Sequence, residues 1–507
     1  MSEQSRAVKV LAANTIAFTI CFSCWMMNGV LITFLVENRL FDWTKSEMGW
    51  LIGIPVLTGA VMRLPVGVLC DKYGGRIVFF LLMILSAVPM YFVGEANSYM
   101  GFVLAGLGFG VTGSSFAAGI AYTALWFDKS RQGTALGIFG AGNAGAALTS
   151  IGAPIVLARL TATDLEGWRT LPKIYAGILI ITAILFWVFT HTRKVNLGTR
   201  TGLLQRLSPL KNVRVWRFGV YYFFVFGGFV ALAQWLIPYY VNAYTMTVAT
   251  AGLMAGIFSF PSGVIRALGG WWSDKMGART VMYWVLGISL VCCLLLVFPA
   301  MLIQSPGKGV MAVSDGTVQK ISENEIVVSG TSYDLKSKNK DEMVGFEDDG
   351  NFIFPTSCSW QEPVVGMKVG DKVGKKQLIA KGTTQIYFQA NVWIFTGLVF
   401  IVGIMMGIGK AAVYKHIPTY FPNDVGVVGG LVGVLGGLGG FFCPIIFGYL
   451  LSWSGLWTTC WMFLAGFVVV CLVWMHMVVQ RMMKKRAPGL VDQIEDWGDP
   501  NNAESAI

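Results

Sequence analysis

Two stretches of this sequence, 53-GIPVLTGAVMRLPVGVLCDKYGGR-76 and 256-GIFSFPSGVIRALGGWWSDKMGAR-279, align with each other without a gap. Two unrelated apolar helices would not share an arginine, an aspartate and a second arginine at identical spacing. The matched charged pairs are Arg63/Arg266, Asp71/Asp274, Lys72/Lys275 and Arg76/Arg279. The chain therefore contains an internal duplication.

A second pair of stretches repeats at a wider separation. Gly137–Pro154 reads GIFGAGNAGAALTSIGAP and Val427–Pro444, 290 positions later, reads VVGGLVGVLGGLGGFFCP, whereas the first pair is separated by 203 positions. The difference of 87 positions is almost the length of a polar segment at 304–388. We therefore predict two equivalent halves, with an extra domain inserted into the second half.

The composition is that of a membrane protein. Hydrophobic residues make up 55% of the 507 residues and charged residues only 13%, with a mean hydropathy of +0.63, whereas a soluble chain carries roughly a quarter charged residues. Outside the insert, successive apolar stretches are long enough to cross a hydrocarbon core of roughly 30 Å. We predict an all-α membrane protein, which excludes a soluble enzyme. The twelve expected spans lie near 8–36, 46–69, 77–95, 98–125, 132–158, 172–191, 213–241, 250–272, 278–303, 389–415, 425–451 and 455–480.

The net charge of +11 is unevenly distributed. Basic residues gather at 193–217 and 481–486 and in the loops on the same side, whereas the opposite loops are short or carry acids. Because cytoplasmic loops carry the excess of Lys and Arg, we expect both termini in the cytoplasm and the chain in the cell (inner) membrane. Topology explains the positive charge, so we predict no nucleic-acid partner.

The polar insert has the pattern of short strands, with alternating apolar and polar residues between Gly-, Asp- and Asn-rich breaks. Its run 365-VGMKVGDKVGKKQLIAKG-382 resembles the half-barrel of biotinyl/lipoyl-like domains, which attach a cofactor to a lysine at a hairpin tip. Lys368 does not stand at a convincing tip, and the topology puts the insert outside the cytoplasm, so we expect no cofactor.

The predicted divisions are a six-helix bundle at 1–192, a cytoplasmic linker at 193–212, the second bundle at 213–303 and 389–482 around the β-rich insert at 304–388, and a cytoplasmic tail at 483–507.

The two repeat-related arginines are the most informative residues. Arg63 lies eight residues before Asp71, so at about 1.5 Å per residue it lies some 12 Å deep, near the midplane. A charge there costs at least about 2.5–3.5 kcal/mol on insertion scales, so it must face a cavity or a partner. No Asp or Glu occurs in the middle of a span. We interpret Arg63 and Arg266 as an anion site, since a guanidinium suits a planar oxyanion; the alternative is structural pairing with backbone carbonyls.

The charged loops after both arginines resemble the signature loop of the major facilitator superfamily, with the pattern G-x-x-x-D-K-x-G-x-R. The resemblance implies a latch between the two halves, so these residues would set the inward–outward equilibrium and would not bind substrate. The predicted gating residues are Asp71, Arg76, Asp274 and Arg279. The same resemblance implies a twelve-helix fold of six plus six helices.

The glycine-rich run Gly140-Ala141-Gly142-Asn143-Ala144-Gly145 resembles the signature of the nitrate/nitrite porters (NarK-type) of that superfamily. The run at 429–440 resembles their second signature without its Asn. The family resemblance implies that two arginines and the signature Asn hydrogen-bond a planar anion held between aromatic rings. It points to Arg63, Arg266, Asn143, Tyr222, Phe116 and Phe226 as substrate-binding residues, and to Gly140, Gly142, Gly145, Gly433 and Gly436 as signature glycines.

Lys410 is the remaining charge inside a span. It lies toward the cytoplasmic end of its predicted helix, so we expect its side chain to extend to the membrane interface. Alternatively it lines the transport pathway or titrates there, because a buried lysine shifts its pKa readily.

These features predict transport of nitrate and nitrite by alternating access. Two facing cations repel each other when the site is empty, and an anion relieves the repulsion, which favours nitrate/nitrite antiport. Proton-coupled nitrate symport, using Lys410 or His416, is the alternative. A sensor that uses the insert to contact an extracytoplasmic partner, an enzyme with an acylated Lys368, and a carrier of another small anion are further alternatives. We expect a monomer without metal or cofactor.

Overall fold

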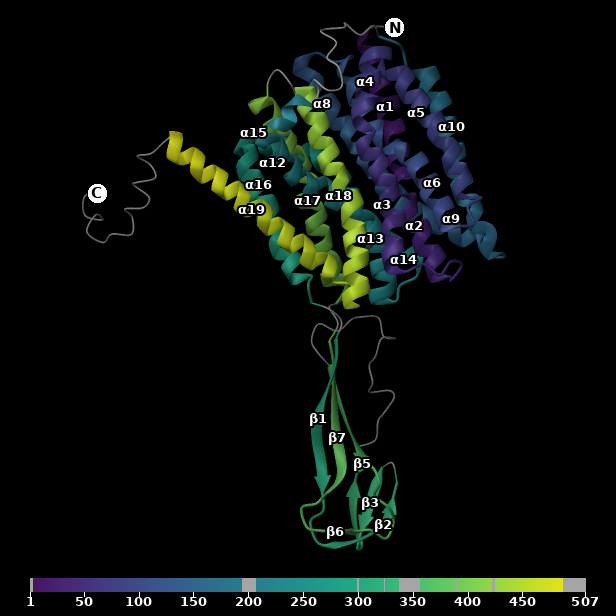
Figure 1. Cartoon of the computed structure of the whole chain (residues 1–507), viewed down its shortest axis with the longest axis vertical. Helices are drawn as coiled ribbons and strands as arrows, with labels where there is room; N and C mark the ends of the chain where they lie inside the picture. The colour runs from purple at the N-terminus through teal and green to yellow at the C-terminus, as the bar shows by residue number, and fades with distance from the viewer. Residues whose placement is uncertain are drawn as a thin grey trace, which may run out of the picture. The chain divides into compact units, whose positions relative to one another are not determined.

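The computed structural model describes residues 3–193, 207–298, 301–322, 324–336, 356–388, 391–421 and 425–486. The chain forms two compact units, one comprising Met1–Pro238, Thr247–Leu295 and Leu398–Ile507 and the other comprising Tyr239–Met246 and Leu296–Gly397. The first unit is a helical bundle that contains both halves of the predicted duplication (Figure 1). The second unit contains all the strands.

The N-terminal half consists of six spans, most of them interrupted near their middle. Its α-helices are α1 (Glu3–Trp25), α2 (Met27–Glu37), α3 (Lys45–Val61), α4 (Arg63–Tyr73), α5 (Gly75–Val93), α6 (Tyr99–Phe109), α7 (Ser115–Ala124), α8 (Lys129–Gly140), α9 (Gly145–Leu160) and α10 (Thr170–Phe189). Short 3₁₀ segments join or precede them: η1 (Gly110–Ser114), η2 (Ala141–Ala144) and η3 (Leu165–Arg169).

The C-terminal half repeats this arrangement and adds a π-helical segment. Its elements are η4 (Ser208–Lys211), α12 (Val213–Tyr222), the π-helix η5 (Phe223–Gly228), α13 (Phe229–Tyr244), α14 (Val248–Val264), α15 (Arg266–Met276), α16 (Ala278–Leu295), α17 (Val392–Tyr420), α18 (Val425–Ser454) and α19 (Thr459–Arg486). Within the described residues, eleven helices are long and apolar enough to span a membrane, or twelve if α14 and the end of α15 count as one bent span. A multi-pass membrane protein is therefore confirmed.

The duplication appears in the backbone as well as in the sequence. The second span breaks at Met62, between α3 and α4, and the eighth breaks at the equivalent Ile265. In the first case Pro65 supplies a cause, because proline has no N–H to donate to a carbonyl four residues earlier. Both spans end at a glycine with positive φ, Gly74 at 89° and Gly277 at 84°. A side chain is strained in that conformation, so the repeat keeps glycine at both positions.

The two halves touch closely on the side opposite to the chain termini. Gly49 of α3 packs against the carbonyl of Pro444 in α18, and the repeat-related Gly252 of α14 packs against the carbonyl of Ser150 in α9. One turn further, a Cβ on Gly53 would lie 2.8 Å from the Phe441 carbonyl oxygen. Small residues four apart allow membrane helices to approach in this way.

Three glycines toward the other end of the bundle lack close neighbours among the described residues. A Cβ added to Gly67, Gly270 or Gly137 would meet nothing within 4 Å among the residues described. Gly67 and Gly270 are related by the repeat and lie beyond the two arginines, toward the termini. The glycine contacts therefore hold the two halves together on the face opposite to the start of α1.

The second unit confirms the β-rich insert. Its strands are β1 (Met301–Met311), β2 (Gly316–Ile321), β3 (Glu325–Val328), β4 (Thr331–Asp334), β5 (Thr356–Pro363), β6 (Lys372–Val373) and β7 (Leu378–Phe388). They form a three-stranded sheet in the order β1-β7-β5 and a four-stranded sheet in the order β4-β3-β2-β6, with antiparallel pairing throughout. Val318, Ile326 and Ile379 belong to its hydrophobic core.

One predicted boundary is wrong. The ninth span was expected to reach 303, but α16 ends at Leu295 and residues 301–303 begin β1. The apolar run through 301–303 reads equally well as helix or strand, and its antiparallel pairing with 386–388 of β7 determines the outcome.

Lys368 lies between two turns and not on a hairpin tip. Its N–H donates to Asp371 at 2.7 Å.

The close contact at Gly252 makes a stability prediction. We expect Gly252→Val to lower the melting temperature of the purified protein, because a side chain there overlaps the Ser150 backbone and overpacking costs about 1–3 kcal/mol. Gly177→Val is the matched control, because a Cβ at Gly177 in α10 meets nothing within 4 Å among the described atoms. Thermal unfolding followed by fluorescence compares them. Equal melting temperatures would show that this contact does not hold the closed face together.

Candidate functional site: a cationic centre between the two halves

Arg63 is buried at the centre of the bundle, with 3% of its surface exposed. It is the first residue of α4, directly after the helix break at Met62. Its Nη1 donates to the carbonyl oxygen of Gly433 in α18 at 2.7 Å. Its Nε and Nη2 are also buried, and neither has a hydrogen-bond partner in the part of the chain that is described. One side of the guanidinium is thus fixed to the opposite half, and two donors remain unpaired.

Aromatic rings surround this guanidinium. The Cζ atom of Arg63 lies 4.8 Å from the ring centre of Phe226, 5.4 Å from that of Phe116 and 5.9 Å from that of Trp25. Cation–π attraction operates within about 6 Å and is stronger away from water. The rings therefore help to stabilise a buried cation that no carboxylate neutralises.

Arg266 occupies the equivalent position at the start of α15. Its Cζ atom lies 5.4 Å from the ring centre of Phe116 and 5.5 Å from that of Tyr414. Phe116 therefore contacts both guanidinium groups at the same distance. Nη1 of Arg266 is buried without a hydrogen-bond partner among the described residues. The two arginines predicted from the repeat are brought to one site.

Neither arginine forms an ion pair with an acidic residue in the described ranges. Burying a charge without a partner is costly, so such groups normally find a counter-charge or a ligand. Two cations with unpaired donors beside one aromatic ring can hold a small anion. Structural pairing with carbonyls accounts for one of Arg63's donors and leaves the others unexplained.

Two other predicted residues present buried polar atoms without partners. Asn143, in η2, is fully buried, and both atoms of its amide lack a hydrogen bond within the described structure. The Tyr222 hydroxyl is likewise unpaired there. Tyr222 stacks on Phe226 at 5.1 Å between ring centres and meets Tyr414 edge-on at 5.0 Å. Tyr222 is therefore linked to the arginine site through Phe226 and Tyr414.

The signature glycines give the site its close packing. Gly433 supplies the carbonyl that binds Arg63, and a Cβ on it would approach the Tyr414 hydroxyl to 3.1 Å. A Cβ on Gly140 would lie 3.4 Å from Cδ of Arg266. Side chains at the other three would overlap a neighbour directly: Gly142 faces Phe18, Gly145 the Thr19 carbonyl, and Gly436 the Tyr222 ring.

The prediction that Lys410 reaches the membrane interface is wrong. Lys410 is fully buried in the bundle. Its Nζ donates to Oγ of Ser262 at 3.2 Å and to the Ser262 carbonyl at 3.5 Å, and it lies 3.1 Å from the ring centre of Phe229. The sequence predicted the depth of Lys410 along its helix. It did not predict on which side of the helix the residue lies, and that side faces the interior of the bundle. The C-terminal end of α14 carries partial negative charge, which stabilises the ammonium group.

Two residues at the site were missed from the sequence. Tyr414 contacts Arg266 and Tyr222 and donates to the Gly429 carbonyl at 2.9 Å. It lies four residues after Lys410, a spacing that places both on one face of α17. This four-residue spacing was the feature of the sequence that could have identified Tyr414. Trp25 donates its indole N–H to the Pro55 carbonyl at 2.8 Å, and no signal distinguished it from other aromatic residues.

The predicted gating residues lie away from the arginines. Arg76 donates to the Trp187 carbonyl and to Thr192, Asp274 pairs with Lys415, and Arg279 donates to the Tyr420 hydroxyl. Each of these contacts lies within one half. These contacts of Arg76, Asp274 and Arg279 do not join the halves in this conformation.

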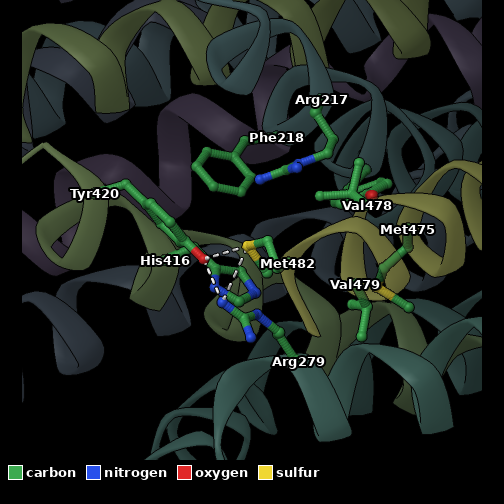
Figure 2. A pocket seen from close by; sticks show the side chains of 10 residues that line it. Arg217, Phe218, Arg279, His416, Tyr420, Met475, Val478, Val479 and Met482 are labelled. Carbon is green, nitrogen blue, oxygen red and sulfur yellow. Dashed lines mark hydrogen bonds between the residues drawn. The ribbon is translucent and has the colours of Figure 1, made fainter. Parts of the chain in front are cut away.

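A pocket lies among α12, α16, α17 and α19 of the C-terminal half, and none of its lining residues belongs to the arginine site (Figure 2). His416, one of the residues considered for proton coupling, lines this pocket. Its ring stacks on Phe218 at 5.4 Å with 3° between the ring planes.

Solved structures share this fold. A bacterial homologue of the human lysosomal transporter Spinster superposes with a TM-score of 0.59 at 14% identity, covering 94% of this chain and 97% of that one. The nucleoside transporter NupG gives a TM-score of 0.57 at 13% identity over 92% and 98% of the two chains. The family model of the Major Facilitator Superfamily matches residues 15–318 and 378–498, omitting 319–377 within the insert. The chain is thus a membrane transporter of the Major Facilitator Superfamily.

Relatives with higher sequence identity identify the branch of the superfamily to which the chain belongs. The "Probable nitrate/nitrite antiporter NarK1" of Thermus thermophilus is 36% identical over 98% of this chain and 97% of its own length. The "Nitrite extrusion protein" of Bacillus subtilis is 25% identical over 92% and 94%. A "Probable nitrate transporter NarT" of Staphylococcus aureus is 25% identical over 93% and 96%. The chain therefore belongs to the nitrate/nitrite porter family.

Proposed function

We propose that this protein exchanges nitrate and nitrite across the inner membrane, and that Arg63 and Arg266 hold the anion. The observation that carries the proposal is a pair of guanidinium groups, buried at Arg63 and partly buried at Arg266, each 5.4 Å from Phe116, with buried unpaired donors and no described carboxylate beside them. The names of the relatives support nitrate and nitrite as the substrates.

The chemistry of the site suits a small planar oxyanion. Guanidinium groups donate in a plane and can form paired hydrogen bonds with two oxygens. Nε and Nη2 of Arg63 and Nη1 of Arg266 are the available donors. The amide of Asn143 and the hydroxyl of Tyr222 would complete the donor set. The flat faces of Phe116 and Phe226 would limit the thickness of the substrate.

Exchange follows from the electrostatics of this site. An empty site leaves two cations facing each other, and binding an anion of charge −1 reduces their repulsion. An occupied carrier should therefore cross between its two conformations more easily than an empty one. Opening and closing would occur by rocking of the two halves, with the glycine contacts of α3 and α14 closing one face. Asp71, Arg76, Asp274 and Arg279 would hold the other face closed in the alternate state.

Proton-coupled symport is the second candidate, because of Lys410. This buried ammonium is held by Ser262 and the Phe229 ring, which are neutral partners, and Arg266 acts on it electrostatically. A lysine without a carboxylate partner can lose its proton inside a protein.

We also propose how the chain is oriented in the membrane and that it acts as a monomer. Both termini lie in the cytoplasm, as the basic loops favour, and the insert lies on the opposite side, where it can contact an extracytoplasmic partner. The carrier acts as a monomer, because one chain contains both arginines and every other candidate residue of the site.

The sharpest test of the site is Arg63→Lys. We expect nitrate affinity to fall by about tenfold or more and transport to be nearly lost, because lysine keeps the charge but loses paired donors worth about 1.5–3 kcal/mol. Nitrate binding to the purified protein by calorimetry measures this. Arg193→Lys, at an exposed arginine paired with Glu3 at 3.0 Å, is the control and should bind normally. Normal nitrate binding by Arg63→Lys would refute the assignment of the site.

Coupling is tested in proteoliposomes loaded with nitrite. We expect external nitrate to enter at a rate set by internal nitrite and not by a pH gradient, because the anions themselves balance the charge. Lys410→Met should retain this exchange. Uptake that requires a proton gradient in the wild type, and loses that requirement in Lys410→Met, would instead establish symport.

The role of the insert is tested by replacing 301–388 with a short Gly/Ser linker. We expect nitrate/nitrite exchange to continue, because all the candidate substrate residues lie in the first unit. A variant that substitutes Ile326→Asp in the insert core is the control for effects of a misfolded insert. Loss of exchange in a well-folded deletion protein would mean that the insert takes part in transport.

A further inference from the structure

The pocket in Figure 2 is lined by basic residues from three helices of the C-terminal half. Arg217 comes from α12, Arg279 from α16 and His416 from α17. The pocket is narrow, with a cavity volume of about 20 Å³, so a ligand larger than a water molecule would have to displace the contact between Arg279 and Tyr420 that borders it. The starts of α12 and α16 and the end of α17 lie on the membrane face that carries the chain termini. This is the face on which basic residues are concentrated.

The basic groups are held in place without a carboxylate in the lining. Arg217 and His416 are at least nine-tenths buried. Both pack on Phe218, with the Arg217 Cζ 5.2 Å from its ring centre. Among the described acidic residues, the nearby Asp274 pairs with Lys415 outside the lining. The pocket therefore carries an excess of positive charge.

A buried hydroxyl in the same lining has no partner. Tyr221 is 2% exposed, and its oxygen forms no hydrogen bond with any described residue. Leaving a buried donor unpaired costs about 1–3 kcal/mol. A donor that lines the same pocket as Arg217 and Arg279 can serve an anionic oxygen, and this observation is independent of the charge argument.

The opposite wall of the pocket is apolar. α19 contributes Met475, Val478, Val479 and Met482, a spacing that places all four on one face of the helix. Beside Arg217, Trp216 is 46% exposed and donates to the Leu210 carbonyl at 2.8 Å. Tryptophan is enriched at the level of lipid headgroups. The pocket thus joins basic side chains to an apolar wall, and Trp216 beside Arg217 favours the depth of the membrane interface.

We propose that this pocket binds the phosphate of an anionic glycerophospholipid. The phosphate would lie among Arg217, Arg279 and the Tyr221 hydroxyl, and an acyl chain would follow the apolar face of α19. A free anion would use the basic end but would gain nothing from the four apolar side chains, which is why we favour a lipid. Basic pockets between spanning helices on the cytoplasmic side are known to receive lipid headgroups.

The site would have a consequence for transport. Arg279 belongs to the repeated loop and now donates to Tyr420. A bound phosphate would compete for this arginine and hold the ends of α16, α17 and α19 together. Anionic lipid would then favour one conformation of the carrier, whichever small anion it moves.

The test uses the full-length protein purified in detergent and compared by native mass spectrometry and thermal unfolding. The probes are phosphatidylglycerol, phosphatidylcholine and inorganic phosphate. We expect one tightly retained phosphatidylglycerol that raises the melting temperature, no such effect from phosphatidylcholine, and no competition from inorganic phosphate. Arg217→Gln should weaken retention by about tenfold, the value expected for losing one charged hydrogen bond.

Arg481→Gln is the matched control, since it removes one positive charge from an exposed position of α19 that does not line the pocket. It should retain the lipid. Val479→Trp keeps every charge but fills the apolar groove, so it should lose the lipid even if Arg217→Gln proves unstable. Equal retention by Arg217→Gln, Arg481→Gln and Val479→Trp would overturn the proposal, and displacement of the lipid by inorganic phosphate would assign the pocket to free anions instead.

Discussion

The placement of two guanidinium groups inside the bundle, with no carboxylate paired to either among the described residues, is the constraint on which the rest of the structure depends. Arg63 and Arg266 cannot be left unpaired in an apolar bundle. Aromatic rings stabilise part of this positive charge, and one backbone carbonyl, that of Gly433, accepts a hydrogen bond from Arg63. The remaining donors include Nε and Nη2 of Arg63 and Nη1 of Arg266, which are buried, and both guanidinium groups lie 5.4 Å from the centre of the Phe116 ring. Under the proposed function an anion satisfies these donors, and the carrier would be most stable when it is loaded.

Helix breaks and glycines allow this arrangement. Arg63 and Arg266 each follow a break, Asn143 lies in the 3₁₀ segment η2, and Phe226 lies in the π-helix η5. Such irregular segments are frequent at functional sites, and in membranes they occur where the protein buries them or where they line a cavity. The glycine contacts of α3 and α14 then hold the two halves together on one face of the bundle.

Much of this could be predicted from the sequence because each position in one half of the duplication can be compared with the equivalent position in the other half. The repeat placed Arg63 and Arg266 at equal depth, and both glycines with positive φ are repeated residues. Depth along a helix does not give the direction of a side chain, however, so the inward-facing Lys410 was misassigned and Tyr414 was missed. Residues 301–303 were misassigned because their strand is determined by pairing with residues more than 80 positions away, which no local pattern contains.

The inward direction of Lys410 changes the electrostatics of the carrier. Three cations, Arg63, Arg266 and Lys410, now lie in the core, and one bound anion compensates a single charge. Lys410 is stabilised by a helix end and an aromatic ring, and no acidic residue in the described ranges forms an ion pair with it. The repulsion that it feels therefore depends on whether Arg266 is neutralised by substrate. If the lysine keeps its proton throughout the cycle, it strengthens the preference for a loaded carrier and hence for exchange. If it releases the proton when the site empties, the same geometry yields symport, so coupling depends on one ammonium group.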